Sequence, residues 1–378
     1  MSDVKLTVSA GGRDRWQCPV TVELEGPGVA SLHEGEQAVP CQSRPLGNGR
    51  CELRFIVERL DAGSSREYVA TLGTPAASES ALRLEERAEG VALLQNGEEL
   101  STYYLSEASA ARPYWYPLPD PYGNSLTRGY PRFPQAGERE DHPHHRSLWV
   151  AYGEVNGTDN WSQLEGHGTQ THESWNALEA GPVYALLDEQ VCWRSNTGAP
   201  VLDEHRVWRV YNLPASCRLW EAEIDLTAAP GVGDVTFGDT KEGGILSVRV
   251  TSSMDAPKGR IENAAGGVNE GETWGKRAHW CDYSGPVKGN WVGVAVFDHP
   301  TSFRYPTWWH VRNYGLMTAN CFGLSHFTEG REDGTYVLPA GETMRFRYRV
   351  YLHPGDATAG QVETRYHDYI HPPQIKVG

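Results

Sequence analysis

Short segments in which apolar and polar residues alternate with period two recur along almost the whole chain, and this pattern limits the fold more than any other feature. The clearest runs cover residues 4–8, 20–24, 51–57, 67–72, 207–211, 219–226, 291–297 and 344–351. Such alternation is typical of strands with one buried face, and Gly- or Pro-containing turns follow many of the runs. Amphipathic helical patterns are scarce, and residues 357–370 form the best candidate. The sequence therefore predicts an all-β protein.

The run at residues 344–351 shows that each of these strands has one apolar face that must be buried. Arg345, Arg347 and Arg349 fall on one side of it, and Met344, Phe346, Tyr348 and Val350 fall on the other. A period-two strand places such sets on opposite faces of a sheet, so the apolar set must be covered by a second layer. Residues 185–193 and 201–211 flank a turn and predict a long hairpin. Many long antiparallel strands within ~300 residues predict a large two-sheet sandwich, or supersandwich.

The spacing of the strands divides the chain into two units. Residues 1–80 carry shorter strands and predict a small N-terminal β-sandwich-like unit. Its end is marked by residues 73–80, which are small and polar and form the best linker candidate. Residues 81–378 carry the longer strands and the polar motifs described below. We therefore expect the functional site in the second unit.

Charge and cysteine content limit the partners and the compartment. The formal net charge is −15, and no Lys/Arg run reverses it locally, so nucleic acid and anionic membranes are not expected partners. No apolar stretch approaches the ~18 residues that span a bilayer, and the first residues lack an apolar segment. The seven cysteines are scattered and include no CxxC pair. This pattern favours a reducing compartment, and we expect a cytoplasmic protein.

The first polar motif is Asp141-His-Pro-His-His-Arg-Ser-Leu-Trp149, with three histidines in four residues. If residues 143–149 are extended, His144 and Arg146 point to one side and His145 points to the other. A histidine pair could bind a divalent metal, or one histidine could transfer protons near neutral pH. The structural alternative is a histidine-rich turn held by hydrogen bonds.

The second group of motifs combines charges with glycines and aromatic rings. Lys241 and Glu242 stand between glycines before a strand, where a charged pair can be positioned in a cleft, although an ordinary polar loop has the same pattern. Residues 274–283 interleave aromatic and cationic side chains and include Trp280. Indole faces stack on the C–H face of a sugar, but a plain buried strand would look similar.

The third motif covers residues 305–315 and continues to His326. Strand alternation puts Trp308, His310 and Arg312 on one face, with Trp309 and Val311 on the other. The first three would form one wall of a sugar site, and Asn320 follows in the same stretch. A metal site would need one of His144 or His145 together with His310 or His326. No ligand spacing specifies such a site, so the sequence requires no cofactor and leaves a divalent metal open. Phosphate-binding and serine-hydrolase motifs are absent from the sequence.

These motifs resemble those of the family labelled "methane oxygenase PmoA-like". The resemblance covers residues 141–157, 238–243, 274–285 and 305–320, with Ser147 standing where the family more often has Gly. It implies a galactose-mutarotase-like supersandwich that binds sugars on a concave sheet and uses His and Glu/Asp as acid and base. It also implies a functional link with sugar oxidoreductases, and hence a role on glycosides or keto-sugars. The oxygenase activity in the label conflicts with the lack of membrane-spanning segments.

Three hypotheses follow from the motifs and the resemblance. The leading one is an acid–base carbohydrate enzyme, either an epimerase, a β-eliminating lyase or a glycoside-cleaving enzyme. Its expected catalytic residues are His144, His145, His310, Lys241 and Glu242, and its expected substrate-binding residues are Arg146, Trp280, Trp308, Arg312 and Asn320. The second hypothesis is a metal-dependent enzyme with ligands among His144, His145, His310 and His326. The third is a non-catalytic sugar-binding protein.

Overall fold

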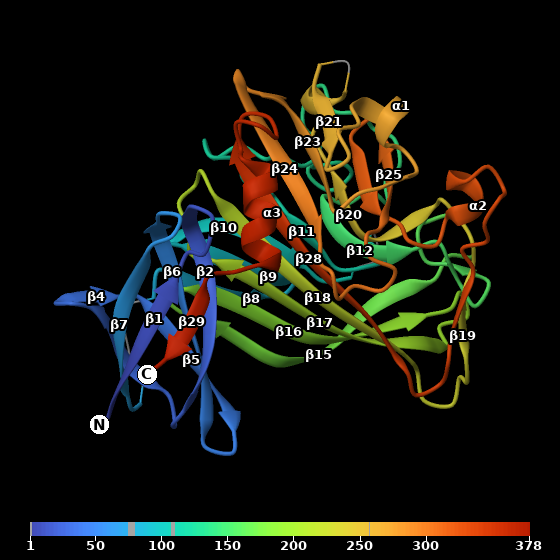
Figure 1. Cartoon of the computed structure of the whole chain (residues 1–378). Coiled ribbons are helices and arrows are strands. Elements are labelled where there is room, and N and C mark those ends of the chain that lie inside the picture. Colours follow the sequence, from blue (N-terminus) through green and yellow to red (C-terminus); the bar gives the residue numbers. More distant parts are fainter. Residues whose placement is uncertain (1, 75–79, 107–109, 257) are drawn as a thin grey trace.

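Two large antiparallel sheets form most of the molecule (Figure 1). The computed structural model describes residues 2–74, 80–106, 110–256 and 258–378. The nine-stranded sheet has the order β22 (Lys276–Arg277), β25 (Trp308–Arg312), β26 (Leu316–Ala319), β20 (Gly243–Arg249), β12 (Leu148–Tyr152), β11 (Tyr114–Tyr116), β10 (Glu98–Tyr104), β9 (Gly90–Gln95) and β8 (Leu82–Arg87). The eight-stranded sheet has the order β15 (Thr169–Ala180), β16 (Tyr184–Arg194), β17 (Pro200–Tyr211), β18 (Arg218–Ala228), β28 (Thr343–Pro354), β24 (Asn290–Asp298), β23 (Trp280–Val287) and β21 (Arg260–Asn263).

The main core lies between these two sheets. In β28 the apolar set expected from alternation, which includes Phe346 and Tyr348, faces this core. In β25 the core-facing residues are Trp309 and Val311, as predicted. Fully burying one such side chain contributes about 1.5–3 kcal/mol, so the alternation decides which face of each sheet packs inward. The expected all-β fold with a large antiparallel sandwich is confirmed, and so is the hairpin of β16 and β17.

A smaller sandwich precedes the large one and has a core of its own. Its five-stranded sheet has the order β29 (Gln374–Val377), β1 (Asp3–Ser9), β7 (Ser65–Leu72), β3 (Val29–Glu34) and β4 (Gln37–Val39). Its three-stranded sheet has the order β2 (Arg15–Glu25), β6 (Arg50–Leu60) and β5 (Cys41–Gly47). The last strand of the chain, β29, pairs with β1 and so returns to this N-terminal sandwich. Residues 75–79 of the expected linker lie outside the described part.

The remaining elements are short. A four-stranded sheet has the order β14 (Thr158–Asp159), β13 (Glu154–Val155), β19 (Val235–Phe237) and β27 (Tyr336–Leu338). The helices are α1 (Asn269–Thr273), α2 (Leu324–Phe327), α3 (Val362–Ile370) and a 3-10 turn at Ser252–Met254. Helix α3 lies in the segment that the sequence predicted to be helical, and it packs beside the N-terminal sandwich (Figure 1). None of the described helices is both long and apolar enough to cross a membrane.

Candidate active site

One row of side chains crosses the outer face of the nine-stranded sheet and connects the motifs singled out in the sequence. Residues directly paired in antiparallel strands share a face, so the register of six strands defines the row. It consists of Tyr104, Tyr114, Trp149, Ser247, Thr318 and His310. Neighbouring strands lie ~4.8 Å apart, which puts the backbone of His310 about 14 Å from that of Trp149. The face therefore has two regions, one at β25 and one at β12.

At the β25 end, His310 is buried and its ring orientation is fixed. The indole N–H of Trp274 donates a hydrogen bond to His310 Nδ1 over 3.0 Å. Burial lowers the pKa of His310 to about 3, helped by the positive charges of Arg312 and Lys241. The imidazole is therefore neutral at pH 7, and because Nδ1 is an acceptor, its proton is on Nε2.

An open cavity of about 540 Å³ lies next to Trp274, the hydrogen-bond partner of His310. Four separated chain segments converge on it, and its wall consists of Lys241, Glu270, Gly271, Trp274, Lys276, Arg312, His326, Phe327 and Glu329. Three of the groups whose charge lowers the pKa of His310, namely Arg312, Lys241 and His326, belong to this wall. The cavity thus combines an indole, a phenyl ring, an imidazole and several cations, and the indole contacts the buried, neutral His310. We call it the β25 pocket.

Two charged pairs contribute side chains to the wall of the β25 pocket. Arg312 contacts Glu270 at 2.6 Å, and its guanidinium lies 5.7 Å from the ring centre of Trp274. The second carboxylate oxygen of Glu270 accepts the backbone N–H of Asn313 over 2.8 Å, which holds this pair in place. The other pair is the ion pair between Lys241 and Glu242, which lies at the surface of the protein. Glu270 belongs to α1, in a stretch where no sequence pattern indicated a site.

Asn320 holds the loop that carries Lys241. It is fully buried, and its amide N–H groups reach the carbonyl oxygens of Thr240, Lys241 and Gly243 over 3.0–3.2 Å. Its amide oxygen accepts two more backbone N–H groups, those of residues 322 and 323. All hydrogen-bonding capacity of this side chain is used within the protein. The structure therefore places Asn320 as a positioning residue and not on the pocket surface where the sequence had expected it.

At the β12 end, residues 142–147 form a turn, because the strand begins only at Leu148. The extended conformation considered for residues 143–149 does not hold at the histidines. His142 and Ser147 have positive φ angles of 41° and 54°, and the N–H of His145 bonds to the carbonyl of His142. The turn brings the rings together instead of alternating them. Ring centres of His144 and His145 lie 4.4 Å apart, and those of His142 and His145 lie 4.8 Å apart.

Arginines surround this histidine cluster. Arg249 donates to His145 Nδ1 over 2.8 Å and to Asp141 over 2.8 Å, and Arg128 contacts Asp141 at 2.7 Å. Burial lowers the pKa of His144 to about 3 and holds the pKa of His145 well below its usual range, and the nearby cations act in the same direction. Both rings are therefore neutral at pH 7. His144 is partly exposed, whereas His145 is buried behind it.

Tyr314 joins the two regions of the face. Its ring stacks on His142 at 5.3 Å, and the guanidinium of Arg249 lies 4.7 Å from its centre. Arg312, from the wall of the β25 pocket, and Glu242, the partner of Lys241, are near enough to influence the pKa of Tyr314, which burial raises. The four histidines proposed as metal ligands are divided between the two regions. Among the described residues, no group of three or more His, Cys, Asp or Glu side chains is arranged to hold a metal ion.

The other expected substrate-binding residues have different positions. Trp308 lies on the same face of β25 as His310, with the guanidinium of Arg277 4.4 Å from its ring centre. Arg146 is buried in the β12 region, 5.6 Å from the ring centre of Tyr114. Trp280 belongs to β23 of the other large sheet, where its N–H donates to Glu363 over 2.7 Å. The structure therefore brings Lys241, Arg312 and His310 together and separates Trp280 from them.

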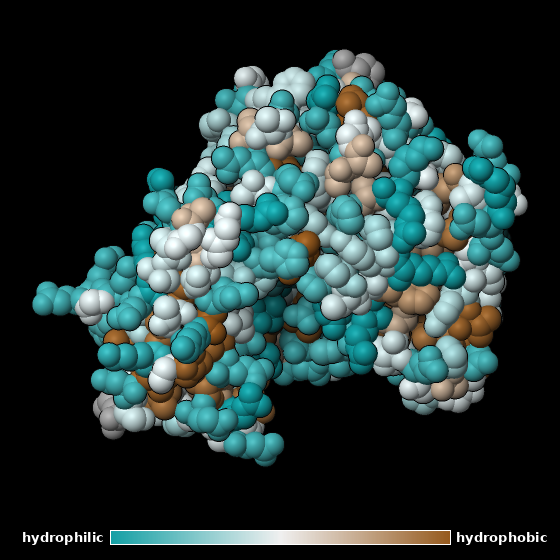
Figure 2. Space-filling model, viewed as in Figure 1, coloured by the Kyte–Doolittle hydropathy of each residue, from teal (hydrophilic) through white to brown (hydrophobic). Residues whose placement is uncertain are grey.

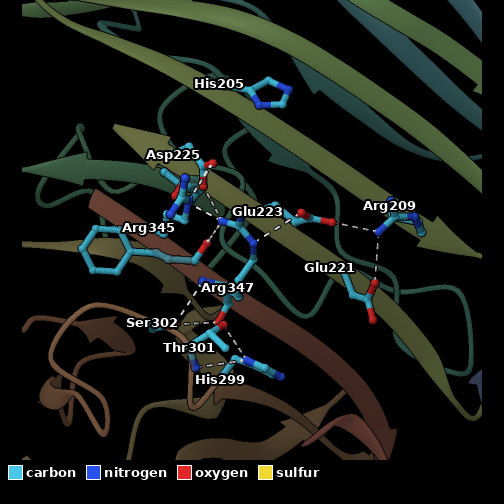
Figure 3. A network of polar contacts seen from close by, with 12 residues as sticks. His205, Arg209, Glu221, Glu223, Asp225, His299, Thr301, Ser302, Arg345 and Arg347 are labelled. Atoms are coloured by element: carbon cyan, nitrogen blue, oxygen red, sulfur yellow. Dashed lines mark hydrogen bonds and ion pairs between the residues drawn. The ribbon is translucent and has the colours of Figure 1, made fainter. Parts of the chain in front are cut away.

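The outer face of the eight-stranded sheet carries a second polar network (Figure 3). Carboxylates of β18 alternate with arginines of the strands on either side, so that Arg347 contacts Asp225 at 2.6 Å and Glu223 at 3.3 Å. Arg209 in turn contacts Glu221 and Glu223 at 3.3 and 3.2 Å. Each charge in this network has an opposite neighbour. The network thus neutralises itself, and it offers less unbalanced charge than the face with the histidines.

The buried histidines predict a specific pH dependence of stability. Because the folded-state pKa of His310 is about 3 and the unfolded value is ~6.5, the unfolded chain binds the extra proton first, and stability falls as the pH drops below 6.5. The loss is up to about 1.4 kcal/mol per pH unit for this residue. Buried carboxyls act in the opposite direction, for example Asp298, whose pKa burial raises to about 7. The contribution of His310 to this pH dependence is therefore measured by comparing the wild type with a variant in which only His310 is replaced.

We expect the His310→Gln variant to lose less stability than the wild type between pH 6.5 and pH 5. Glutamine can still accept the Trp274 N–H, and it does not titrate. The measurement is urea unfolding of both proteins at pH 7.5, 6.5, 5.75 and 5.0. Parallel stability curves for the two proteins would contradict the neutral, buried state of His310.

Comparison with known proteins gives a family without an assigned activity. A structure described as a protein in the glycosyl hydrolase family 38 from Enterococcus faecalis is similar, with 10% sequence identity and a TM-score of 0.47. The match covers 100% of this chain, which spans about half (47%) of that protein. No curated protein matches the chain. Residues 90–367, which include both regions of the face, match the family DUF6807. The chain therefore belongs to DUF6807, a family of unknown function.

Proposed function

We propose that this protein is a carbohydrate enzyme that transfers a proton next to the carbonyl group of an oxidised sugar, leading to β-elimination or epimerisation. The observation that carries the proposal is the neutral His310, fixed by Trp274, which also lines a pocket whose wall contains Lys241, Lys276 and Arg312. The resemblance to the PmoA-like family points the same way, because it implies a fold whose members bind sugars and a link with sugar oxidoreductases. An oxidoreductase would supply the keto group, and the elimination itself requires no cofactor.

A neutral imidazole is suited to polarise a carbonyl group. With its proton on Nε2, His310 would donate a hydrogen bond to the carbonyl oxygen without first carrying a charge that must be desolvated. When the neighbouring C–H bond breaks, the electron pair moves onto that oxygen. The cationic groups of Lys241 and Arg312 would then stabilise the enolate, and their effect is larger in a partly buried pocket than in water.

His326 is our candidate for the base. It belongs to the wall of the β25 pocket, and an imidazole can accept a proton near neutral pH. In an elimination, the C–H proton goes to His326, the bond from the β-carbon to the leaving oxygen breaks, and the imidazolium returns a proton to that oxygen. In an epimerisation, His326 keeps the abstracted proton, and a proton from solvent is added to the same carbon from the opposite side.

The remaining wall fits a sugar ring. Trp274 and Phe327 provide apolar surface for C–H groups, and the Arg312–Glu270 pair provides a donor and an acceptor for hydroxyl groups. A volume of about 540 Å³ is within the range of small-molecule sites. The β12 region, with its neutral histidines and several arginines, lies on the same face and would contact a larger glycoside beyond the reacting ring.

The proposal predicts turnover of an aryl 3-keto-glucoside with release of the aryl alcohol, measured by absorbance. We expect His326→Gln and Lys241→Met each to lower kcat by ~10²-fold or more, because they remove the base and an enolate-stabilising charge. The matched control is Arg345→Ala, on the opposite outer face, which should retain full activity.

Two results would replace this proposal with an alternative. Loss of turnover after dialysis against EDTA, with recovery on adding a divalent metal, would favour the metal-dependent enzyme. Saturable binding of the keto-glucoside without conversion, unaffected by His326→Gln, would favour a sugar-binding protein.

A further inference from the structure

A second large cavity lies between the N-terminal sandwich and the body of the molecule, and we propose that it is a separate binding groove for a neutral oligosaccharide. Its volume is about 1110 Å³, roughly twice that of the β25 pocket. It is formed by β2 and β6 of the N-terminal sandwich, by the end of β21 and the residues after it, and by the start of α3. Figure 2 shows the molecular surface hollowed between the N-terminal sandwich and the rest of the molecule. This inference does not depend on the proposed reaction.

The groove contains an exposed tryptophan. Trp16 has 37% of its surface exposed, and it is paired across β2 and β6 with Arg59, which also lines the groove. The guanidinium of Arg365 lies 5.5 Å from the Trp16 ring centre and holds the ring in place. Indole faces contact the C–H groups of sugar rings favourably, because the apolar surface is large and the N–H remains available.

Two buried polar atoms next to each other in the chain have no partner among the described residues. The amide oxygen of Asn263 accepts two backbone N–H groups, but its Nδ2 donates to nothing. In Glu262, Oε1 contacts Arg260 at 3.1 Å, whereas Oε2 has no hydrogen bond. Both residues line the groove, and Asn263 is only 3% exposed. Leaving such groups unpaired costs ~1–3 kcal/mol each, so each calls for a partner.

The combination of one unpaired donor and one unpaired acceptor suits hydroxyl groups. One hydroxyl of a sugar can donate to the Glu262 carboxylate while another accepts from the Asn263 amide, so a single ligand with several hydroxyls supplies both partners. An anion would match only the amide, and a cation would match only the carboxylate. The unpaired atoms therefore favour a polyhydroxylated ligand.

The charges around the groove also favour an uncharged ligand. Arg15 and Arg365 both pair with Asp368, at 2.9 and 3.1 Å, and Arg59 pairs with Asp61 at 3.0 Å. The wall also contains the carboxylates of Asp14, Glu262 and Glu363, so its positive and negative charges nearly balance and provide little net attraction for a phosphate or a nucleotide. The volume exceeds the range typical of drug-sized ligands, which fits several sugar units better than one.

This groove also accounts for Trp280, which the sequence associated with sugar binding. The structure separates Trp280 from the histidines and places it in the groove wall, where its N–H is held by Glu363. The groove thus has indole rings from two parts of the chain, Trp16 and Trp280.

The test is binding of cellohexaose, maltohexaose and xylohexaose, each measured by calorimetry and tryptophan fluorescence. We expect saturable binding of at least one of them to the wild type, weakened about tenfold or more in Trp16→Ala and in Glu262→Gln. The matched control is Trp291→Ala, because Trp291 is also exposed, at 41%, but does not line the groove. Thermal unfolding checks that each variant is folded.

The His310→Leu variant separates this proposal from the proposed function, because it alters the β25 pocket and leaves the groove unchanged. Hexasaccharide binding should persist in His310→Leu. Binding that is lost in His310→Leu but unchanged in Trp16→Ala would assign the glycan to the β25 pocket and overturn the proposal. Absence of saturable binding for all three hexasaccharides would overturn it as well.

Discussion

Replacing His310 by leucine is expected to lower kcat/KM for the keto-glucoside by ~10²–10³-fold, the usual effect of removing one preorganised donor to a developing oxyanion. Leucine has no N–H to offer the carbonyl oxygen and leaves the Trp274 N–H without its acceptor. His310→Gln should recover part of the activity, because an amide can accept from Trp274 and donate to the substrate at the same time. Activity that is equal in His310→Leu and the wild type would contradict the assignment.

The pH profile separates this role from that of a proton-accepting histidine. Because the pKa of His310 is about 3, this residue stays neutral across the working range, and it does not cause the acidic limb of the profile. We therefore expect the acidic limbs of the wild type and His310→Gln to coincide while the maximal rates differ. Disappearance of the acidic limb in His310→Gln would show that His310 is itself the titrating base.

Replacing Arg206 by methionine is expected to destabilise the protein by ~3–5 kcal/mol, the usual effect of leaving buried charges without their partner. Arg206 is completely buried between the large sheets. It contacts Glu204 at 2.6 Å and Glu189 at 3.8 Å, and it donates to the Tyr103 hydroxyl over 2.9 Å. Methionine would fill much of the space but leave two buried carboxylates facing each other.

Urea unfolding at pH 7.5 measures this effect. The control is Arg345→Ala, which breaks a surface pair with Asp225 and should cost less than about 1 kcal/mol, since the Arg345 side chain is 61% exposed. If Arg206→Met does not fold, Tyr103→Phe tests the same network with a smaller expected loss of ~1–2 kcal/mol. If Arg206→Met and Tyr103→Phe both lower the free energy of unfolding by no more than Arg345→Ala does, the buried charges do not stabilise the protein as proposed.

The sandwich was predictable because strand alternation is a local property. The side of β28 that carries Phe346 and Tyr348 is defined by the sequence itself, and so is the face of β25 that carries His310 and Arg312. The face on which each of these residues lies can be predicted without knowing which strands pair with which. Their apolar neighbours determine which way each strand turns when the sheets pack together.

The partners in the β25 pocket could not be predicted in this way. Glu270 and Trp274 lie some distance from β25 in the sequence, and only the folded connection through α1 brings them beside His310 and Arg312. Trp280 has an aromatic and cationic neighbourhood like that of a sugar site, but its strand pairs within the other sheet. Sheet membership depends on long-range pairing, which alternation alone does not reveal.

The histidine motif illustrates a different difficulty. Alternation predicts opposite directions for His144 and His145 only in an extended strand, and the positive φ angles of His142 and Ser147 turn the backbone before β12 begins. Neither residue is a glycine, so the sequence gives no clear sign of this turn. Asn320 shows the same limit, because an amide that is saturated by backbone groups looks no different in sequence from one that binds a ligand.

Proton exchange is the most direct measurement of the central claim, the transfer of a proton next to a sugar carbonyl in the β25 pocket. Methyl 3-keto-glucoside would be incubated with the protein in D₂O and followed by ¹H NMR. The account predicts that the C–H signals next to the carbonyl disappear faster than in buffer, and that His326→Gln abolishes this acceleration. Exchange at the buffer rate with the wild-type protein, or undiminished exchange with His326→Gln, would contradict it.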